Sequence, residues 1–237
     1  MEEMKVGEKW FLRKEMGKML RPILYYTLTS PPSRSTLLSA AAIGLKLDIK
    51  DVNLAKREHL TPEFLKINPQ HTLPTLNDNG FILWDSHSIN TYLVRKYAKN
   101  DNLYPKDPAM RAKVDQCMYF DCGSLFYAMS VIFIRPILYK GKKGIEESEM
   151  YLIKDAYRVL EKMLDGKEWL VGDSYTLADI SNVCSISTLE LLKPFDTYPN
   201  IKEWVKRCEK NIPGYVEWNL PGVEKFRQIM KLPSSNL

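Results

Sequence analysis

The sequence predicts an α/β unit followed by an all-α unit. Up to about residue 97, short strand-like apolar runs alternate with helical patterns in the order βαβ and then ββα. A polar stretch that contains prolines, Lys99–Pro108, follows and has the composition of a linker. Beyond it, apolar residues recur with a helical period almost throughout. We therefore expect one domain over residues 21–99, a second over residues 109–237, and an extension outside the fold over residues 1–20.

The first strand and the first helix are separated by a short turn. Ile23–Tyr26 is a β-like run, and Ser30 after it is a good N-cap residue. Pro31 and Pro32 follow, in the first helical turn, which tolerates proline. The helix is expected to end near Gly44. Its stripe of apolar and small residues comprises Leu37, Leu38, Ala41, Ala42 and Leu45.

Three further strands and a short helix are predicted before the linker. Leu47–Leu54 indicates the second strand, and Thr61–Phe64 starts a short helix. Leu73–Leu76 and Phe81–Trp84 are apolar runs on either side of Asn77–Gly80, which is a strong hairpin signal. Because four residues separate the two runs, we expect a loop longer than two residues.

A second capped helix start follows the hairpin, at Asp85 and Ser86. The first backbone N–H groups of a helix lack intrahelical partners and lie at the positive end of the helix dipole, so helix starts bind anions. Two such starts, at Ser30 and at Asp85, in one small unit predict a small, anionic, peptide-like ligand. The apolar stripe of the second helix comprises Ile89, Leu93 and Tyr97.

The second half of the chain has the pattern of a helical bundle. Thr176 and Asp179 have the spacing of a capping box, with Asp in place of the usual Glu, and we expect a structural role for them. One apolar stripe comprises Met118, Cys122, Leu125, Phe126, Met129 and Phe133. Another comprises Ile153, Ala156, Tyr157, Leu160 and Leu164.

Composition narrows the class of protein. With 237 residues and 45% hydrophobic composition, the chain can bury a full core. Its net charge of +5 is modest and spread out, which argues against a nucleic-acid partner. The four cysteines have neither a CxxC spacing nor a metal-ligand pattern with the three histidines, so we expect free thiols in a reducing compartment and no metal. No apolar run approaches the roughly 20 residues of a membrane span, and cytosol is the expected location.

The order and spacing of five local motifs resemble the cytosolic glutathione transferases. The insect delta and epsilon classes are the most similar, and Ser-Pro-Pro favours epsilon. The resemblance extends from about Pro22 to Lys231. It implies a thioredoxin-like first domain, a helical second domain and a homodimer. The motifs are Ser30-Pro31-Pro32, Glu58-His59-Leu60, the run from Asn68 to Thr72, Leu73-Pro74 and Asp85-Ser86-His87.

The ligand that the resemblance implies is glutathione, which has two carboxylates, an amine and a thiol. Ser30 is the implied catalytic residue, because its hydroxyl can donate a hydrogen bond to the sulfur. Together with the helix dipole, this lowers the thiol pKa from its reference of about 8.5. Leu73 is implied to pair its backbone with the cysteinyl part of glutathione, next to Pro74 in the cis form. The alternatives are that Ser30 is only an N-cap and Pro74 an ordinary trans proline.

The two ends of glutathione also have implied partners. Asp85 can pair with the amine, while Ser86 and the free amides beside it hold the γ-glutamyl carboxylate. His71 and His59 resemble positions that face the glycine carboxylate, and His87 is expected to reach the same end of the ligand as Ser86. The alternative for each residue is capping, packing or simple surface exposure.

The electrophile is expected in an apolar pocket beside the sulfur. Leu138 or the segment around Phe226 is expected to close this pocket. Helical spacing alone predicts instead that the wall residues of the second domain belong to its core. The implied wall residues are Pro32, Phe126, Met129, Phe133 and Leu138.

Two departures from related patterns bear on the reaction. Some epsilon members carry an arginine directly after the position of Met129, where this chain has Ser130, and Arg135 lies more than a turn later. A positive charge between the two subsites is therefore not expected from that position. The first helix begins without cysteine, so disulfide exchange of the kind that CxxC motifs perform is not expected either.

Together, these features predict a dimeric, cytosolic, epsilon-like glutathione transferase that conjugates glutathione to hydrophobic electrophiles in detoxification. Glutathione is the cosubstrate, and dehydrochlorination and peroxide reduction are secondary activities that the resemblance implies. One alternative is a non-catalytic carrier of hydrophobic ligands such as steroids. Ser30 argues against it, because a carrier needs no thiolate-stabilising hydroxyl. Another is a scaffold protein that docks through residues 1–20.

Overall fold

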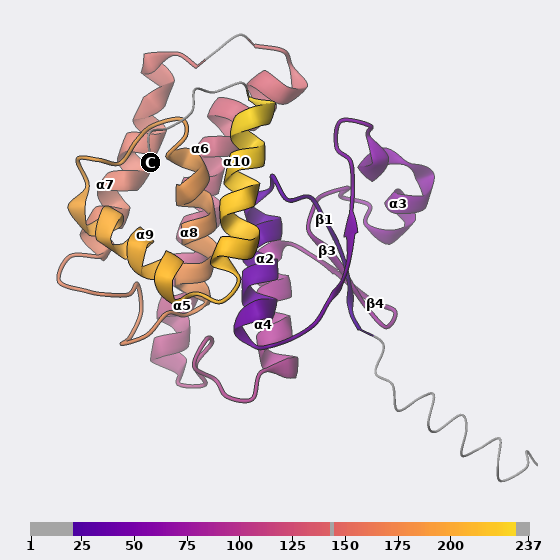
Figure 1. Cartoon of the computed structure of the whole chain (residues 1–237), viewed down its shortest axis with the longest axis horizontal. Coiled ribbons are helices and arrows are strands. Elements are labelled where there is room, and N and C mark those ends of the chain that lie inside the picture. The colour runs from indigo at the N-terminus through magenta and orange to yellow at the C-terminus, as the bar shows by residue number, and fades with distance from the viewer. Residues whose placement is uncertain (1–20, 143–144, 231–237) are drawn as a thin grey trace, which may run out of the picture.

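A computed structural model describes residues 21–142 and 145–230, apart from the side chains of residues 137–139. Residues 1–20, the expected extension, lie outside the described residues. In the described part, a four-stranded mixed sheet with its helices comes first and a helical unit follows (Figure 1). The predicted fold class is confirmed. The boundaries expected for the two domains stay a prediction.

The sheet has the spatial order β2-β1-β3-β4. β1 pairs in parallel with β2 and antiparallel with β3, and β3 pairs antiparallel with β4. β2 is an edge strand, and all four of its residues are exposed. The strands are β1 (Ile23–Tyr26), β2 (Asp48–Asp51), β3 (Thr75–Asp78) and β4 (Phe81–Trp84).

The hairpin between β3 and β4 is tighter than expected. Asp78 pairs directly with Phe81, so only Asn79 and Gly80 form the loop. Both have positive φ, 53° and 95°, as a two-residue turn of type I′ requires. The prediction of a longer loop was wrong because Asn77 and Asp78 belong to the strand, although their polar side chains break its apolar pattern.

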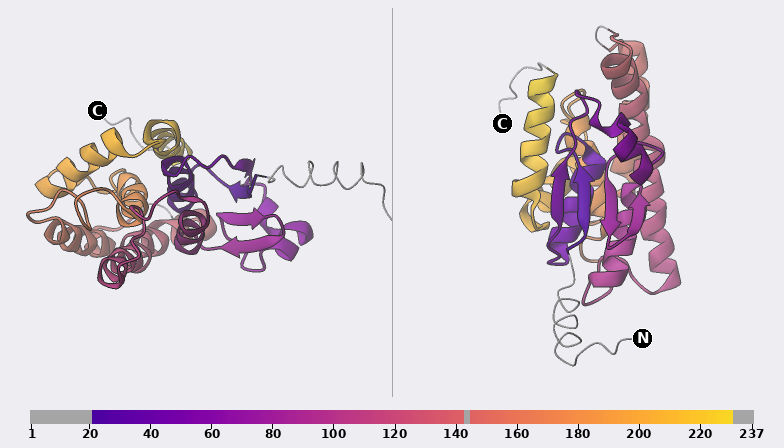
Figure 2. Two further views of the ribbon diagram at one scale, coloured as in Figure 1. Left: turned by 90° about the horizontal axis from the view of Figure 1, so that it is seen from below. Right: turned by 90° about the vertical axis from the view of Figure 1, so that its right-hand side faces the viewer.

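Helices cover both faces of the sheet. α2 (Pro31–Ala42) and α4 (Ser86–Tyr97) lie on the face toward the helical unit, and α3 (Pro62–Ile67) lies on the other (Figure 2). Leu24 of β1 is fully buried in the cluster below α2 and α4. The next residue, Tyr25, packs edge-on against Phe64 of α3, with ring centroids 5.8 Å apart. Because successive side chains of a strand point to opposite faces of the sheet, β1 contributes to the packing on both faces.

The helical unit is built around one long helical segment. α5 (Pro108–Phe120) continues through the π-helical stretch η2 (Asp121–Leu125), α6 (Phe126–Met129) and the π-helical stretch η3 (Ser130–Tyr139). The remaining helices are α7 (Tyr151–Met163), α8 (Leu177–Leu189), α9 (Pro199–Asn211) and α10 (Leu220–Ile229). Short helical turns are η1 (Glu58–Leu60), η4 (Glu147–Met150) and η5 (Tyr215–Asn219).

The capping box predicted for α8 is confirmed. Asp179 Oδ2 accepts a hydrogen bond from the Thr176 N–H at 2.9 Å, and the Thr176 hydroxyl accepts one from Ala178 at 3.2 Å. Asp179 also accepts from the indole N–H of Trp204 in α9 at 2.9 Å. The box therefore ties two helices of the unit together.

One stretch of the described residues, Pro108–Pro136, is long and apolar enough by composition alone to cross a membrane. This differs from the expectation that no apolar run comes near that length. Val114, Leu125 and Met129 of this stretch are completely buried in the helical unit. We therefore interpret it as the core helix of that unit.

α2 belongs to both halves of the molecule. It lies between the sheet and the helical bundle and contacts α4 on one side and α8 on the other (Figures 1 and 2). Leu37 packs in the cluster below the sheet, whereas Leu38 packs in the core of the helical unit. The N-terminus of α2 is consequently held by two packed units.

Candidate functional site

The segments that carry the candidate residues leave the sheet at one end. Tyr25, near the end of β1, pairs with Thr75 at the start of β3, and Thr75 pairs with Trp84 at the end of β4. The end of β2 lies there too, because Tyr26 pairs in parallel with Asp51. The candidate residues reached from this end of the sheet are Ser30, His59, Leu73 and Asp85.

Ser30 is the N-cap of α2. It has extended backbone angles, φ −85° and ψ 118°, and its hydroxyl oxygen accepts a long hydrogen bond of 3.4 Å from the Ser33 N–H. Pro31 and Pro32 have no N–H, so the Ser33 amide is the first donor of the helix. The hydroxyl hydrogen of Ser30 remains available as a donor. Capping and ligand binding are therefore compatible roles for this residue.

The start of α4 is built differently. Asp85 is its N-cap, with Oδ1 accepting from the Ser88 N–H at 3.0 Å, and its side chain is 52% exposed. The N–H groups of Ser86 and His87 have no hydrogen-bond acceptor among the described residues. Two free amides beside an exposed carboxylate suit a ligand that carries both a carboxylate and an amine.

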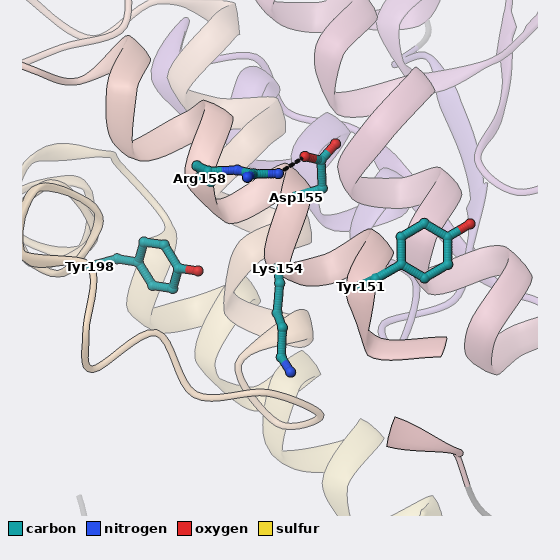
Figure 3. Close-up of a pocket in the computed structure, with 5 residues that line it drawn as sticks. All are labelled: Tyr151, Lys154, Asp155, Arg158 and Tyr198. Atoms are coloured by element: carbon teal, nitrogen blue, oxygen red, sulfur yellow. Dashed lines mark hydrogen bonds and ion pairs between the residues drawn. The ribbon is translucent and has the colours of Figure 1, made fainter. Parts of the chain in front are cut away.

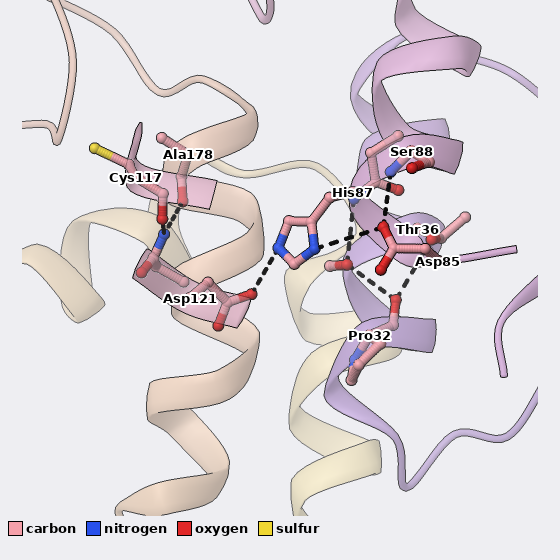
Figure 4. A network of polar contacts seen from close by, with 11 residues as sticks. Pro32, Thr36, Asp85, His87, Ser88, Cys117, Asp121 and Ala178 are labelled. Atoms are coloured by element: carbon pink, nitrogen blue, oxygen red, sulfur yellow. Dashed lines mark hydrogen bonds and ion pairs between the residues drawn. The ribbon is translucent and has the colours of Figure 1, made fainter. Parts of the chain in front are cut away.

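His87 points toward the helical unit. Its Nε2 lies 3.0 Å from Asp121 Oδ2 of η2, and its Nδ1 lies 3.9 Å from Asp85 Oδ1 (Figure 4). Burial lowers the pKa of His87, but the hydrogen bond and charge of Asp121, with Asp85, outweigh burial, so the pKa is raised. His87 thus bridges the two units behind Asp85. Its expected contact with a ligand at Ser86 stays a prediction.

The peptide bond between Leu73 and Pro74 is cis, as predicted. Asn68 holds the preceding turn: its Nδ2 donates to the Thr72 carbonyl at 3.0 Å and to the Thr75 hydroxyl at 2.9 Å. No backbone hydrogen bond of Leu73 is found within the described part of the chain. Its N–H and C=O are therefore available to an extended ligand segment.

The two remaining candidates form a pair of imidazoles, His59 and His71, with ring centroids 6.2 Å apart. His59 is 5% exposed, and its Nδ1 has no partner among the described residues. Burial, and to a lesser degree His71 and Arg57, lower the pKa of His59. A carboxylate beside these rings would find an imidazole N–H donor on each of them.

Backbone strain marks the same segments. Among the described residues other than glycine, positive φ occurs at Arg57 (58°), His71 (49°), Asn79 (53°) and Asp85 (73°). Asn79 is explained by its hairpin turn. The other three lie at or within two residues of candidate ligand-binding positions. Strained backbone conformations of this kind are frequent at binding sites, where the surrounding structure stabilises them and so fixes the position of a side chain.

The expected wall of the electrophile pocket is largely packed. Met129 and Phe133 are 0% and 1% exposed, and the Phe133 ring lies 5.2 Å from the Phe226 ring of α10. Here these two residues are buried in the core, the alternative that helical spacing predicts, and α10 packs against Phe133. Pro32 and Phe126 keep some exposure, and the Leu138 side chain lies outside the described part.

A surface hollow lies elsewhere, along α7 (Figure 3). It is lined by Tyr151, Lys154, Asp155, Arg158 and Tyr198. Both cations are already paired, Arg158 with Asp155 and Lys154 with Glu147. The hollow contains none of the candidate residues. In the described part of the chain, no group of three His, Cys, Asp or Glu side chains is placed to hold a metal ion.

Three residues that support the candidate site were missed by the sequence analysis. Arg34 and Asn68 are fully buried, and Asp121 is 5% exposed. Arg34 and Asp121 have partners that lie far away along the chain, such as His87 for Asp121, whereas Asn68 bonds within its own turn. Only Asn68 carried a local signal, because it lies in the motif before the cis-proline.

Both parts of the chain match known family models. Residues 22–95 match the N-terminal domain of glutathione S-transferases, and residues 125–211 match the C-terminal domain. Together they span more than half of the chain.

Solved structures agree with this match. The chain is similar to a delta-class glutathione transferase of Nilaparvata lugens, with 42% identity, 89% of this chain and 98% of that chain covered, and a TM-score of 0.84. An epsilon-class glutathione S-transferase of the housefly, Musca domestica, has 39% identity, with coverage of 89% and 97% and a TM-score of 0.86. A glutathione transferase homologue of Drosophila mojavensis, solved with bound glutathione, has 40% identity, with coverage of 90% and 97% and a TM-score of 0.85. With its fold, its cis-proline and both domain models in agreement, the chain belongs to the glutathione S-transferase family.

Proposed function

We propose that this glutathione transferase activates glutathione at the N-terminus of α2, where the Ser30 hydroxyl donates a hydrogen bond to the sulfur. The observation that carries the proposal is the Ser-Pro-Pro start of the helix. Pro31 and Pro32 supply no N–H, so the Ser30 hydroxyl and the helix dipole are the groups left to stabilise one anionic atom there. A stabilised thiolate is the nucleophile, and the protein contributes its position and its electrostatic environment.

The rest of glutathione would extend along the strained segments. The Leu73 backbone would pair with the cysteinyl part beside cis-Pro74. Asp85 would bind the amine, and the free amides of Ser86 and His87 would bind the γ-glutamyl carboxylate. His59 and His71 would hold the glycine carboxylate. The free amides, the unpaired imidazole nitrogen and the open Leu73 backbone described above support these assignments.

The electrophile would approach from the helical unit. Pro32 and Phe126 keep apolar surface near the start of α2 and in α6, and we propose them as the accessible part of the pocket. Met129, Phe133 and Leu138 would join this pocket where α10 moves away from the long helical segment. The reaction class is nucleophilic substitution or addition by the thiolate on a hydrophobic electrophile.

We further propose a cytoplasmic homodimer. Membership of the family supports both statements. Tyr119 of α5 and Tyr127 of α6 are 72% and 49% exposed, and a second copy could cover such aromatic surface. Light scattering of the purified protein measures the oligomeric state directly, and a monomeric mass at micromolar concentration would overturn this part of the proposal.

Conjugation of glutathione to a chlorinated nitroarene tests the catalytic assignment. We expect Ser30→Ala to reduce kcat by about 100-fold or more, the usual effect of losing one donor to a developing or stabilised anion. Thr61→Ala is the matched control, because Thr61 is also an N-cap followed by proline, at the start of α3. Unchanged activity in Ser30→Ala would remove Ser30 from the mechanism.

A further inference from the structure

Arg34, in the first turns of α2, is a fully buried cation. None of the ion pairs of the described residues involves it. Burial lowers the pKa of its guanidinium to about 10, which still leaves it charged at neutral pH. A buried charge without a counter-charge is costly and is retained only where its hydrogen bonds have a use.

The guanidinium reaches back to the turn that presents Ser30. Nη1 donates to the carbonyl of Leu28 at 3.4 Å. The same turn is closed by the Ser30 N–H donating to the Thr27 carbonyl at 3.1 Å, and the Thr27 N–H donates to the Ser33 hydroxyl at 3.4 Å. Two side chains of α2 thus bind the backbone of the turn: Ser33 accepts from its Thr27 N–H, and Arg34 donates to its Leu28 carbonyl.

The other end of the guanidinium is anchored in the helical unit. Nη2 donates to the Cys184 carbonyl at 3.0 Å and to the Thr188 hydroxyl, both in α8. Arg34 therefore connects the Ser30 turn to a helix whose residues are all buried.

α10 closes over this connection through a glycine. A Cβ atom added at Gly222 would lie 2.3 Å from Cδ of Arg34 and 2.5 Å from the carbonyl oxygen of Leu28. Both distances are far inside van der Waals contact, so only glycine permits this approach. Leu28, Arg34 and Gly222 are therefore in close contact, and a side chain at position 222 would displace the turn or the guanidinium.

We propose that Arg34 is a positioning residue for the thiolate site: anchored on α8 and enclosed by α10, it fixes the Leu28 carbonyl and thereby the turn that aims the Ser30 hydroxyl. The inference rests on the proposed role of Ser30. This role explains why a charge is buried here. Only a guanidinium has the several N–H donors needed to bind a carbonyl of the turn and two acceptors on α8 at the same time. An aliphatic side chain could fill the same space but could not hold the turn.

The test compares three variants by the pH dependence of thiolate absorbance of bound glutathione, and by kcat and KM. Arg34→Met keeps most of the side-chain volume and removes the guanidinium donors. Thr188→Val removes one anchor on α8 without touching the turn. Ser181→Ala is the control, because Ser181 is equally buried in α8 and its hydroxyl has no partner among the described residues.

We expect Arg34→Met to lower kcat by about 10- to 100-fold, the effect of misplacing a catalytic group by about 1 Å. The thiol pKa of bound glutathione should rise by about one unit, which is a tenfold loss of thiolate below that pKa. Thr188→Val should lower kcat by about 2- to 10-fold, the range for one hydrogen bond. Ser181→Ala should leave both kcat and the thiol pKa of bound glutathione unchanged. KM for glutathione should change little in all three, because the ends of the ligand are bound elsewhere.

Two results would overturn the inference. The first is an unchanged thiol pKa in folded Arg34→Met. The second, which decides the matter where Arg34→Met does not fold, is a thiol pKa in Thr188→Val equal to that in Ser181→Ala. Ser30→Ala separates this inference from the proposed function: an unchanged thiol pKa there removes the function assigned to Ser30. A raised pKa in Ser30→Ala together with an unchanged one in Arg34→Met removes only the role of Arg34.

Discussion

The N-termini of α2 and α4 begin at the same end of the sheet but offer a ligand different groups. α2 starts with two prolines, so it presents one hydroxyl and no free amide before Ser33. α4 presents two free amides beside the exposed carboxylate of Asp85. A single donor suits a one-atom anion such as a thiolate, whereas two amides suit the two oxygens of a carboxylate. The dipole is common to both helices, and the side chains and prolines decide what each one binds.

The two starts also differ in how they are held. The turn before α2 has ordinary backbone angles and is anchored by buried Arg34. Asp85 has a positive φ of 73° and is supported from behind by His87 and Asp121. Chemistry at the sulfur requires a precise position, while binding of the γ-glutamyl end requires charge and free donors. Variants at the two starts should therefore separate kcat from KM.

Among variants at the start of α4, the largest effect is expected for Asp85→Asn, which removes the charge but keeps an N-cap that tolerates positive φ. KM for glutathione should rise by about 10- to 100-fold, the value of a hydrogen bond to a charged group, with kcat unchanged. Steady-state kinetics with varied glutathione measure both. Asp107→Asn, at the N-cap of α5, is the matched control. A fall in kcat with constant KM would contradict the assignment of glutathione binding to the start of α4 and of catalysis to the start of α2.

A smaller effect concerns stability and pH at α4. Because the folded-state pKa of His87 is raised, its protonated form stabilises the fold fully below the unfolded pKa, and this stabilisation is lost as pH rises through the folded pKa. The unfolding free energy of the wild type relative to His87→Gln should therefore fall as the pH rises from about 6.5, the unfolded pKa, through the raised folded-state pKa. Urea unfolding at several pH values measures this difference.

His71→Gln serves as the control for that experiment, because His71 is exposed and has no ion pair among the described residues. Parallel pH profiles for the wild type and His87→Gln would mean that the bridge to Asp121 does not depend on the charge of the imidazole.

Ser86→Ala should separate the hydroxyl from the amides at the start of α4. The amides remain and still bind the carboxylate, so KM for glutathione should rise by only about 3- to 10-fold, the range for one ordinary hydrogen bond. Ser88→Ala, two residues later and exposed, should leave KM as it is. Isothermal titration with glutathione reports the affinities. A loss as large as that of Asp85→Asn would show that the hydroxyl, rather than the amides, binds the carboxylate.

The smallest effect is expected for Pro31→Ala, which gives α2 the free amide that it lacks. A second donor near the sulfur should raise kcat below the thiol pKa by about 2- to 3-fold. Pro108→Ala, at the same position of α5, controls for the change in helix propensity. The rate is measured at a pH below the thiol pKa of the wild type. A lower rate in Pro31→Ala would indicate that the prolines aim the Ser30 hydroxyl rather than merely remove donors.

The features predicted correctly depend on a few neighbouring residues. The N-caps Ser30 and Asp85 and the capping box at Thr176 each involve a side chain and an amide two or three positions away. The family motif located cis-Pro74. The hairpin loop was misjudged because polar Asn77 and Asp78 pair as strand residues.

The features that were missed depend on contacts between distant segments. Arg34 meets Thr188, 154 positions away, and His87 meets Asp121, 34 positions away. Helical spacing placed Met129 and Phe133 on an inward face, but it could not say whether that face lines a pocket or packs against α10. No local pattern encodes which part of a stripe a later helix will cover.

The charged edge strand β2 has a consequence for the protein in a crowded solution. An edge strand leaves half of its backbone groups unpaired and can template the addition of a strand from another molecule. In β2, Asp48, Lys50 and Asp51 surround the lone apolar residue, Ile49, which is 39% exposed. A second copy would have to desolvate these charges and bring like charges together. The sheet is thereby protected against intermolecular growth on this side, although no element of the described part of the chain covers it.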